Sequence, residues 1–587
     1  MPQNEKIAGA IMERIQDHVN YARLFMRNAA EIDRMYRANP ADKMGRGQAE
    51  PGKPKANTAS LEYFRNIESV TSAVDAVEFG DEPWFLPWSD ELRDDVIEAT
   101  RLTQATMDNQ HEAMGLRMKV RSAIRHCLNH GTLVAHTVWR KRERWIDTGD
   151  RFRSQVLFDG PDWVNIPIWR WHFDPTAHEI EDMIWCSFEY DISKQGLQEI
   201  ITAAEGLPLA ETRNLRNLDL EGKISSEGFE VSRTIEITRG YSSVKPDTVH
   251  VDEYWGIHPT KKNPNDPKGE EALPMIWRIL IVNGKEWVLQ MPNPYAHGEF
   301  PFIKINFIKD EESFYGLGHG DLISRAYKMI NKRRNLIIDI VNTSLLGMWQ
   351  RSGGQVGKMA NRIRLYPGKI FDSHIEGVIS PLPVNTTGLR SGFQMDQIEI
   401  EEIRAATAAT SNVQAIQQGG TATEIRNIAT ESARRISTFA TELADKGLRP
   451  FLNRQDELNQ QFLPEIFSVQ TTDSQGIPTA KVVEKADLLR RARFKMKVAT
   501  DLEFRRTILR NLNASLGNVA QIIQAAPVVA PALIPSLIQM TKKTLQMYGI
   551  NPNEAIPSEV VQQVMAAQKA QAQQQPGPAR PRQAAPA

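Results

Sequence analysis

The sequence predicts an α+β protein that is predominantly helical, and three observations support this class. Stretches near both ends carry apolar residues at helical spacing, as in Ile11, Ile15 and Val19. From about Thr132 to Phe307 the apolar period changes to two, which is typical of strands. After Phe314 the helical period returns, interrupted by Gly-rich and basic segments. At 587 residues the chain is long enough for about three or four domains.

The composition is that of an ordinary soluble globular protein, with 41% hydrophobic residues, 24% charged residues and a net charge of -1. A net charge this small argues against general nucleic-acid binding, so any contact with DNA must be local. The apolar runs are shorter than the ~18 residues of a membrane span, and no signal peptide is visible, so neither a membrane nor export is expected. Cys127 and Cys186 are expected to be reduced core thiols, with no metal site or cofactor.

Three helical segments are predicted before the β region. The first runs from Glu5 to Arg37, and the second starts at Ser60 and is ended by Gly80 and Pro83. The third is one block from about Ser89 to His130, with Gly131 as its C-cap. The segment from 38 to 58 is rich in Gly, Pro, Lys and Asn and is expected to be a loop.

The β region contains several alternating segments and one helix. The strand candidates are TLVAHTVWRKR, RFRSQVLFD, WVNIPIWRWHFDP, TIEITRGYSS, TVHVDEYWGI and MIWRILIVNGKEWVLQM. Asn283-Gly284 in the last of these predicts a hairpin with a type I′ turn. The helix is expected from Ser193 to Ala204.

A basic helix and a basic loop follow. The helix starts near Asp321, taken as its N-cap, and its polar stripe contains Arg325, Lys328, Lys332, Asn335 and Asp339. Residues 351–370 carry five basic residues and no acid: Arg351, Lys358, Arg362, Arg364 and Lys369. Pro367-Gly368 fits a type II turn, so RIRLY and KIF are predicted to form a hairpin.

An acidic return helix is predicted from Phe393 to Thr410, with Asp396, Glu399, Glu401 and Glu402 against Arg404. Residues 411–420 read as a loop. Thr421 and Glu424 form a capping box that opens a long helix. A further helical region spans Asp501 to Tyr548, and the low-complexity end, 549–587, is expected to be disordered.

No motif supports an enzyme. Gly357-Lys358 lacks the P-loop's first Gly, because Ser352 occupies that position, and Met359 replaces the required Ser or Thr. The segment 316–321 has Asp321 where a dinucleotide loop needs its last Gly, so it is read as a flexible strand-to-helix junction. The chain has no H-E-x-x-H and no G-x-S-x-G.

The basic run at 351–370 could also be a solvated surface hairpin.

Between about Ser60 and Leu463 the sequence resembles the portal proteins of tailed bacteriophages, also called head-to-tail connectors, of the short-tailed type. The resemblance rests on the order of four segments: His172-Phe173-Asp174-Pro175-Thr176-Ala177, Glu253-Tyr254-Trp255-Gly256, Phe314-Tyr315-Gly316-Leu317-Gly318 before the helix with Asn331 and Arg334, and Gly420-Thr421-Ala422-Thr423-Glu424-Ile425. It implies a portal fold with wing, stem, clip and crown regions, assembled as a ring of about twelve copies. The resemblance assigns no catalytic residue to this sequence.

The resemblance implies a division of the chain into named regions. These are a wing at 1–320, a first stem helix at 321–346, a clip at 347–392, a second stem helix at 393–410, a tunnel loop at 411–420, a long wing helix and return at 421–500, a crown at 501–548 and the tail at 549–587. The residues expected to dock partner proteins are Lys358, Arg362, Arg364 and Lys369. Those expected to line the channel are Lys328, Lys332, Glu399, Glu402 and Arg404. The tunnel loop is expected to act through Gln414, Gln417, Gln418 and Gly419.

The function implied is a non-enzymatic channel for double-stranded DNA at one capsid vertex, used in packaging and ejection. Expected partners are further copies of the chain, the terminase large subunit, a tail or adaptor protein, and capsid and scaffolding proteins. The expected location is the virion, with assembly in the host cytoplasm. Two alternatives remain: an enzyme acting on nucleic acid, such as a nuclease or ATPase, and a capsid or tail structural protein without a channel.

Overall fold

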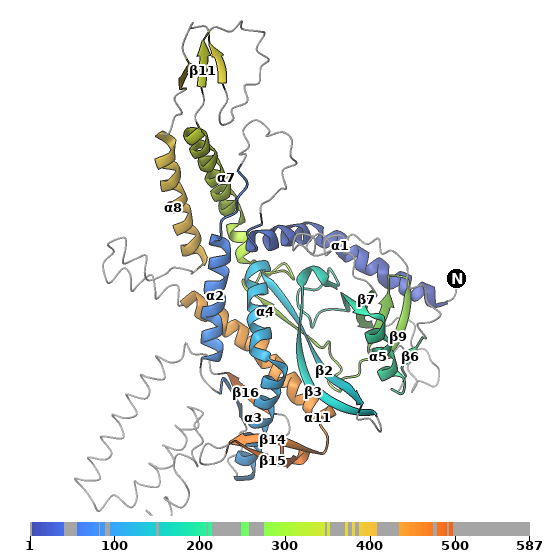
Figure 1. Ribbon diagram of the computed structural model, residues 1–587. Coiled ribbons are helices and arrows are strands. Elements are labelled where there is room, and N and C mark those ends of the chain that lie inside the picture. The colour runs from blue at the N-terminus through green and yellow to red at the C-terminus, as the bar shows by residue number, and fades with distance from the viewer. Residues whose placement is uncertain are drawn as a thin grey trace, which may run out of the picture.

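The structure is a computed structural model in which helices and antiparallel sheets form a body, and two helices extend from it as an arm (Figure 1). It describes residues 3–39, 56–80, 83–88, 94–147, 152–207, 209–213, 248–257, 275–346, 349–352, 370–373, 379–381, 387–407, 434–472, 478–489 and 492–496. The expected mixture of helices and sheets is confirmed, and helices make up about half of the structure. Among these residues, no helix is both long enough and apolar enough to cross a bilayer.

A six-stranded antiparallel sheet forms one half of the body, in the order β4-β5-β7-β8-β9-β6. Its strands are β4 (Trp171–Phe173), β5 (Trp185–Ser193), β6 (Glu211–Thr212), β7 (Thr248–Ile257), β8 (Ile276–Val282) and β9 (Glu286–Pro292). Helix α1 (Gln3–Tyr36) packs Ile11 and Ile15 on one face, and α5 (Lys194–Ala204) packs Leu197 on the other. Because both faces are covered, β7 is buried along most of its length.

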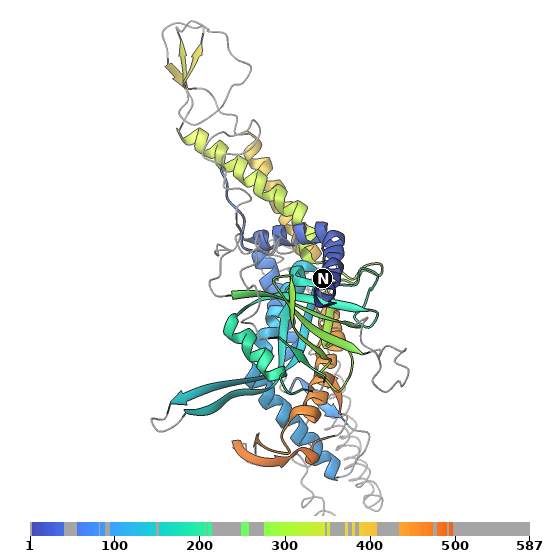
Figure 2. The ribbon, with the colours of Figure 1, turned by 90° about the vertical axis from the view of Figure 1, so that its right-hand side faces the viewer.

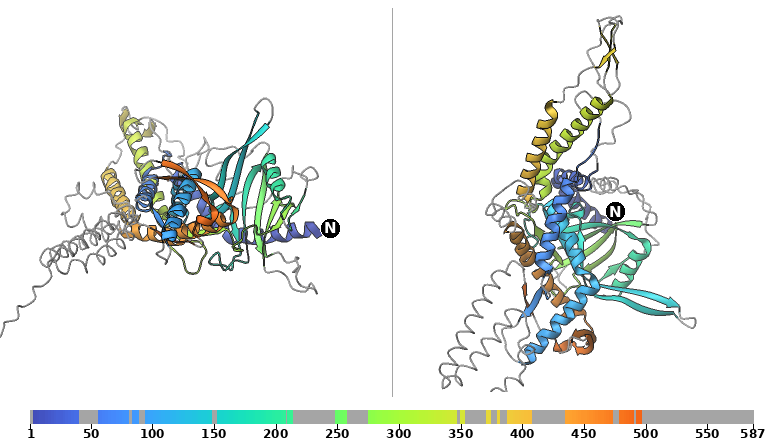
Figure 3. Two further views of the ribbon diagram at one scale, coloured as in Figure 1. Left: turned by 90° about the horizontal axis from the view of Figure 1, so that it is seen from below. Right: turned by 60° about the vertical axis from the view of Figure 1, so that its left-hand side comes forward.

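The second half of the body is helical. It contains α2 (Glu62–Phe79), α3 (Asp94–Met114), α4 (Leu116–His130), a helix at 434–443 with a π-helical continuation (Ala444–Leu448), and α11 (Arg449–Phe462). The largest apolar core lies among α2, α4, the first turns of the arm and the segment 434–462. Figure 3 shows α2 and α4 beside each other, in line with the arm.

Four smaller sheets complete the described chain. Strands β10 (Phe302–Asn306), β2 (Thr132–Asp147) and β3 (Phe152–Ile166) form one sheet. Strand β1 (Phe85–Trp88) pairs with β16 (Arg493–Met496), and β14 (Ile466–Thr472) pairs with β15 (Pro478–Glu484). At the tip of the arm, β11 (Trp349–Ser352) lies between β12 (Ile370–Ser373) and β13 (Ile379–Pro381).

Several predicted elements are confirmed. Helix α1 matches the first predicted helix, and Ser193 caps α5 by accepting from the Gly196 amide at 3.1 Å. Asn283 and Gly284 both have positive φ, and the Lys285 amide donates to the Val282 carbonyl at 3.0 Å, as a type I′ turn requires. Gly131 caps α4 with φ of 79°, and its amide donates to the Cys127 carbonyl.

Other predictions were wrong in their boundaries. The single helix over 89–130 is two helices, because Gly115 adopts φ of 64° between them. Asp321 is not the N-cap of the arm helix. That helix starts at His319, and the Asp321 carboxylate accepts from the Gly318 amide, as the third residue of a capping box does.

The tip of the arm holds a strand pairing that was not predicted. Ile370 and Phe371 of KIF lie in β12, which pairs in parallel with β11, so that Trp349 lies opposite Ile370. The hairpin of KIF with RIRLY stays a prediction. RIRLY lies outside the described residues. The same holds for TIEITRGYSS, the capping box at 421–424, the helical region 501–548 and the C-terminal tail.

The junction at 316–321 is tightly packed rather than open. A Cβ on Gly131 would lie 2.0 Å from the Gly316 carbonyl oxygen, and one on Gly320 would lie 2.5 Å from the Ile32 side chain. The Phe307 amide donates to the Gly131 carbonyl at 2.8 Å. These glycines let the end of α4, the end of β10 and the start of the arm come into backbone contact.

We predict that Gly131→Ala lowers stability far more than Gly115→Ala. Both residues have positive φ, so each Ala costs about 1–2 kcal/mol from the left-handed backbone. Only Gly131 also has backbone atoms where the Cβ would lie, whereas the space around Gly115 is open to 4 Å. Urea unfolding of both variants measures the difference, and equal losses would contradict this packing.

Candidate functional site: the arm and its root

The arm consists of α7 (His319–Leu346), the tip sheet and α8 (Thr387–Thr407). Figure 2 shows α7 leaving the body and α8 returning beside it. Helix α7 starts two residues before the predicted first stem helix, and α8 starts six residues before the predicted second one. The helical part of the return therefore extends into the segment assigned to the clip.

Ion pairs join the two arm helices near the middle of α7. Arg333 donates to Asp396 at 2.8 Å and also pairs with Glu399, and Arg334 approaches Asp396 at 3.5 Å. The Asp396 side chain is only 6% exposed, so its charge is compensated by two guanidinium groups rather than by water. The hydrogen bond to Glu399 raises the pKa of Arg333. These contacts hold α8 against α7.

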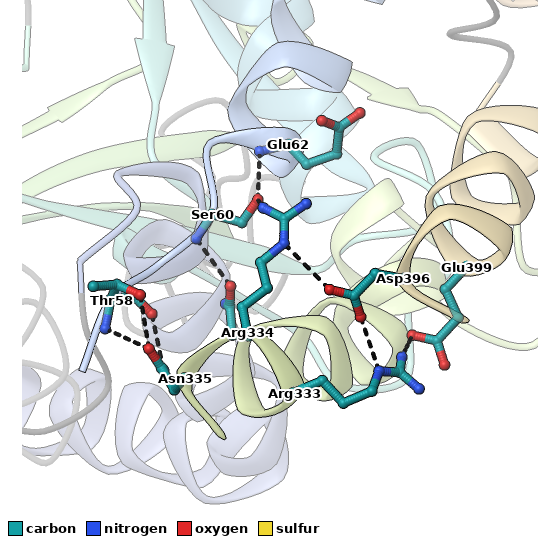
Figure 4. A network of polar contacts seen from close by, with 9 residues as sticks. Thr58, Ser60, Glu62, Arg333, Arg334, Asn335, Asp396 and Glu399 are labelled. Atoms are coloured by element: carbon teal, nitrogen blue, oxygen red, sulfur yellow. Dashed lines mark hydrogen bonds and ion pairs between the residues drawn. The ribbon is translucent and has the colours of Figure 1, made fainter. Parts of the chain in front are cut away.

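An extended segment of the chain, 56–60, lies along the middle of α7 (Figure 4). The backbone amides of alternate residues donate to side chains four residues apart on the helix. Ala56 donates to Asp339, Thr58 to Asn335 and Ser60 to Asn331, each at 2.9 Å. Two residues of extended chain span ~6.8 Å and four helical residues span ~6 Å, so the two periods nearly match.

Further bonds close this contact around Ser60 and Thr58. Asn335 donates back to the Thr58 carbonyl at 3.1 Å, and Arg334 donates to the Ser60 hydroxyl oxygen at 2.7 Å. Tyr327 donates its hydroxyl to the Ser60 carbonyl. We call the row Asn331, Asn335 and Asp339 the acceptor row. It ties the chain that enters α2 to the middle of α7.

The predicted channel residues divide into two groups. Lys328 pairs with Glu31 of α1 at 2.8 Å, Glu399 pairs with Arg333, and Arg404 donates to Glu62 of α2 at 2.7 Å. In the described part of the chain, Lys332 and Glu402 are exposed and have no such partner. Their role in a channel stays a prediction.

The other predicted site residues lie outside the described residues. These are the docking residues Lys358, Arg362, Arg364 and Lys369, and the loop residues Gln414, Gln417, Gln418 and Gly419. In contrast, the sequence interpretation assigned no role to Arg333 or to the acceptor row. The signal available for the row was an Asn, Asn, Asp repeat at a spacing of four residues.

The arm exposes apolar side chains on both helices. Leu322, Met329 and Leu336 are seven residues apart on one face of α7 and are 48%, 50% and 36% exposed. On α8, Met395 and Ile398 are more than half exposed. We call these five residues the apolar arm face. It is left uncovered by the described part of a single chain.

A second polar cluster lies under α1 in the six-stranded sheet, and it is where a cation could bind. The ligand atoms of Glu189, His250 and Asp252 lie within 4.8 Å of one another. The imidazole of His250 already contacts Glu189 and Asp191, both at 3.2 Å. Burial alone would lower the pKa of His250, but the hydrogen bonds to these carboxylates outweigh it and raise the pKa to about 12. A protonated imidazole therefore supplies the positive charge, and the expectation of no metal stays a prediction.

We predict that Asn335→Ala exposes segment 56–60. The Thr58 amide loses its acceptor and the Thr58 carbonyl loses its donor, a loss of about 1–3 kcal/mol. Hydrogen exchange at Thr58 should accelerate by roughly 5- to 150-fold. Asn20→Ala, an exposed helical asparagine on α1, is the matched control and should leave Thr58 unchanged. Unchanged exchange in Asn335→Ala would contradict the acceptor row.

We also predict a pH-dependent cost for His250→Gln. The pKa of His250 is raised to about 12 in the folded chain against an ordinary value of 6.5, so the stabilisation is complete below about pH 6.5 and falls as the pH rises toward 12. The difference in Tm between the parent and His250→Gln should be largest near pH 6 and should shrink by pH 9. A difference that grows with pH would contradict a buried imidazolium.

A comparison with known families found a match that begins at the end of β7, before the arm, and runs beyond it. A family model described as bacteriophage head to tail connecting protein matches residues 257–554, half of the chain. The match includes β8–β10, both arm helices, the tip sheet and α11. No curated protein matches the chain. The match agrees with the resemblance drawn from the sequence segments, and the chain therefore belongs to the bacteriophage head-to-tail connecting proteins.

Proposed function

We propose that this chain is a portal subunit, and that copies of it form a ring at one capsid vertex through which double-stranded DNA enters and leaves the head. Its family stands at the junction of the phage head and tail, with capsid and tail components around it, and is structural rather than enzymatic. We propose three things beyond membership of this family: the channel, the subunit number and the individual partners.

The apolar arm face is the observation that carries the proposal. The arm projects from the body, so a single copy leaves this face in water (Figure 1). Burying a leucine or methionine side chain contributes about 1.5–3 kcal/mol. When arms stand side by side around an axis, each face is covered by the next copy, and a head-to-tail contact of this kind closes into a ring.

Charge on the arm supports the same arrangement. Arg325 and Lys332 accompany the apolar stripe of α7, and Glu402 lies on the outer side of α8; all three are exposed. Asp396 and Glu399 are already paired with Arg333 and Arg334. The exposed charges of Arg325, Lys332 and Glu402 are therefore the ones able to face a neighbouring copy or a channel. Two of these three charges are basic and one is acidic, so the net excess is a single positive charge, and a DNA duplex would slide rather than adhere.

The finer assignments follow from the resemblance. About twelve copies would form the ring, the tip of the arm would dock the terminase large subunit during packaging and a tail or adaptor protein afterwards, and the body would contact capsid and scaffolding proteins. The motor activity would come from the terminase. Assembly would take place in the host cytoplasm and the finished ring would remain in the virion.

We predict that Leu336→Glu prevents ring assembly. The charged side chain would have to be buried against the next arm, which costs more than the contribution of about 1.5–3 kcal/mol lost with the leucine at each contact. Negative-stain microscopy and light scattering of the full-length protein measure the result. Leu24→Glu is the control, because Leu24 is 75% exposed on α1, away from the arm.

The control should assemble like the parent. Rings of unchanged mass from Leu336→Glu would contradict the role of the apolar arm face. A parent protein that forms filaments, or no particle with a central hole, would contradict the portal itself.

A further inference from the structure

Strands β2 and β3 continue beyond their sheet as a two-stranded ribbon. Strand β10 pairs with β2 only from Thr132 to His136, whereas β2 and β3 stay paired out to Asp147 and Phe152. Figures 2 and 3 show the ribbon standing away from the body. Its outer residues from 140 to 157 add little to the core, because those with a described burial are exposed. A free two-stranded ribbon is only marginally stable in water, so its faces are available for a partner.

The register places four arginines on one face of the ribbon. Arg140 lies opposite Gly160, Arg142 opposite Phe158, Arg144 opposite Gln155, and Arg153 opposite Ile146. Side chains of alternate residues point to the same face, so these eight residues share it. We call them the arginine face. It contains no carboxylate.

A β-bulge is what brings Arg153 to this face. The pairing shifts between Arg142 and Glu143, which leaves Leu157 without a partner in β2. Arg153 and Phe158 are five residues apart, so in a regular strand they would point to opposite faces. The extra residue restores the alternation and turns Arg153 to the side of Arg142 and Arg144. Leu157 itself is 60% exposed, so no core packing explains the bulge.

The outer arginines are not neutralised within the described chain. Arg140, at the base, pairs with buried Asp162 at 2.9 Å, and the guanidinium of Arg142 lies over the Phe158 ring at 5.4 Å. Arg144 and Arg153 have no carboxylate partner among the described residues. The three outer positions therefore present uncompensated positive charge.

The opposite face of the ribbon carries one lysine and three carboxylates, those of Glu143, Asp147 and Asp159. Lys141 pairs with Glu143 at 2.6 Å, and Ser154 donates to the same carboxylate at 2.7 Å. Asp159 accepts from the Trp139 indole at 2.8 Å. The contrast between the two faces shows that the positive charge is concentrated on one side of the ribbon and is not spread over both.

We propose that the arginine face binds the phosphate backbone of double-stranded DNA. Arg142 and Arg144 are one alternate step, ~6.8 Å, apart along β2. A duplex carries negative charge at ~3.4 Å intervals along each strand, and guanidinium groups bind phosphate oxygens through paired hydrogen bonds. A two-stranded ribbon also fits the ~12 Å major groove.

A protein partner suits this face less well. Protein interfaces have an apolar centre depleted of charge, whereas the only large apolar side chains here are Ile146 and Phe158, and Arg142 covers Phe158. The contact lies on the body and not on the arm. It therefore shares no residue with the proposed channel lining of the arm.

Fluorescence anisotropy of a labelled random-sequence duplex, titrated with the full-length protein at several NaCl concentrations, tests the proposal. Arg144→Glu and Arg153→Glu should each weaken binding about eightfold at 0.1 M salt and reduce the salt slope by about 1, the effect of one lost phosphate contact. Lys141→Glu is the matched control, because it makes the same charge change on the opposite face; its effect should stay below about twofold.

Deletion of Leu157 gives a charge-neutral test of the bulge. It keeps every basic residue but turns Arg153 to the other face, and it should weaken binding as much as Arg153→Glu. Equal weakening by Lys141→Glu, or no effect of either arginine variant on DNA binding, would overturn the proposal. If the arginine variants changed the mass of the assembly instead, the face would be a contact between copies of the chain.

Discussion

The arm depends on the contact between segment 56–60 and the acceptor row of α7. A helix that leaves a body has few apolar neighbours, and its direction must be fixed near its root. Here alternate backbone amides bond to Asn331, Asn335 and Asp339, so the entering chain and the helix are joined over three successive steps. Arg334 links this contact to Asp396 and thereby to α8. Both arm helices are thus tied to the body through one polar network.

This network changes the electrostatic account of the arm. The sequence shows an acidic return helix, which by itself indicates a negative wall facing DNA. In the folded chain, two of its acids are held by Arg333, and Arg404 is held by Glu62. Most of the charge therefore acts inside the chain, in stability and orientation. The exposed surface of the arm combines the apolar arm face with charged residues such as Arg325, Lys332 and Glu402, and its apolar part favours contact between copies as the main role of the arm.

Local patterns in the sequence predicted those turns and caps that depend only on neighbouring residues. The type I′ turn at Asn283-Gly284, the Ser193 cap and the Gly131 cap were found because each needs particular residues within four positions. The break at Gly115 was missed, because a glycine within a helical pattern can be tolerated or can end the helix.

Features that depend on distant segments could not be predicted in the same way. The acceptor row joins residues more than 270 positions apart, and the parallel pairing of β11 with β12 joins strands separated by a long connection. The arginine face requires the bulge at Leu157, and no residue type in RFRSQVLFD marks it. The family itself was recognisable from the order of its short segments, whereas the partners of the site residues became visible only in the fold.

The central claim is that the apolar arm face is covered by the next copy, and thiol labelling of the assembled particle tests it most directly. Both native cysteines are buried, so the background is low. Met329→Cys on the arm should react with maleimide at least about tenfold more slowly than Met118→Cys on α4, although a single chain exposes the two methionines by 50% and 70%. Equal labelling of the two cysteines in the assembled particle would contradict the account.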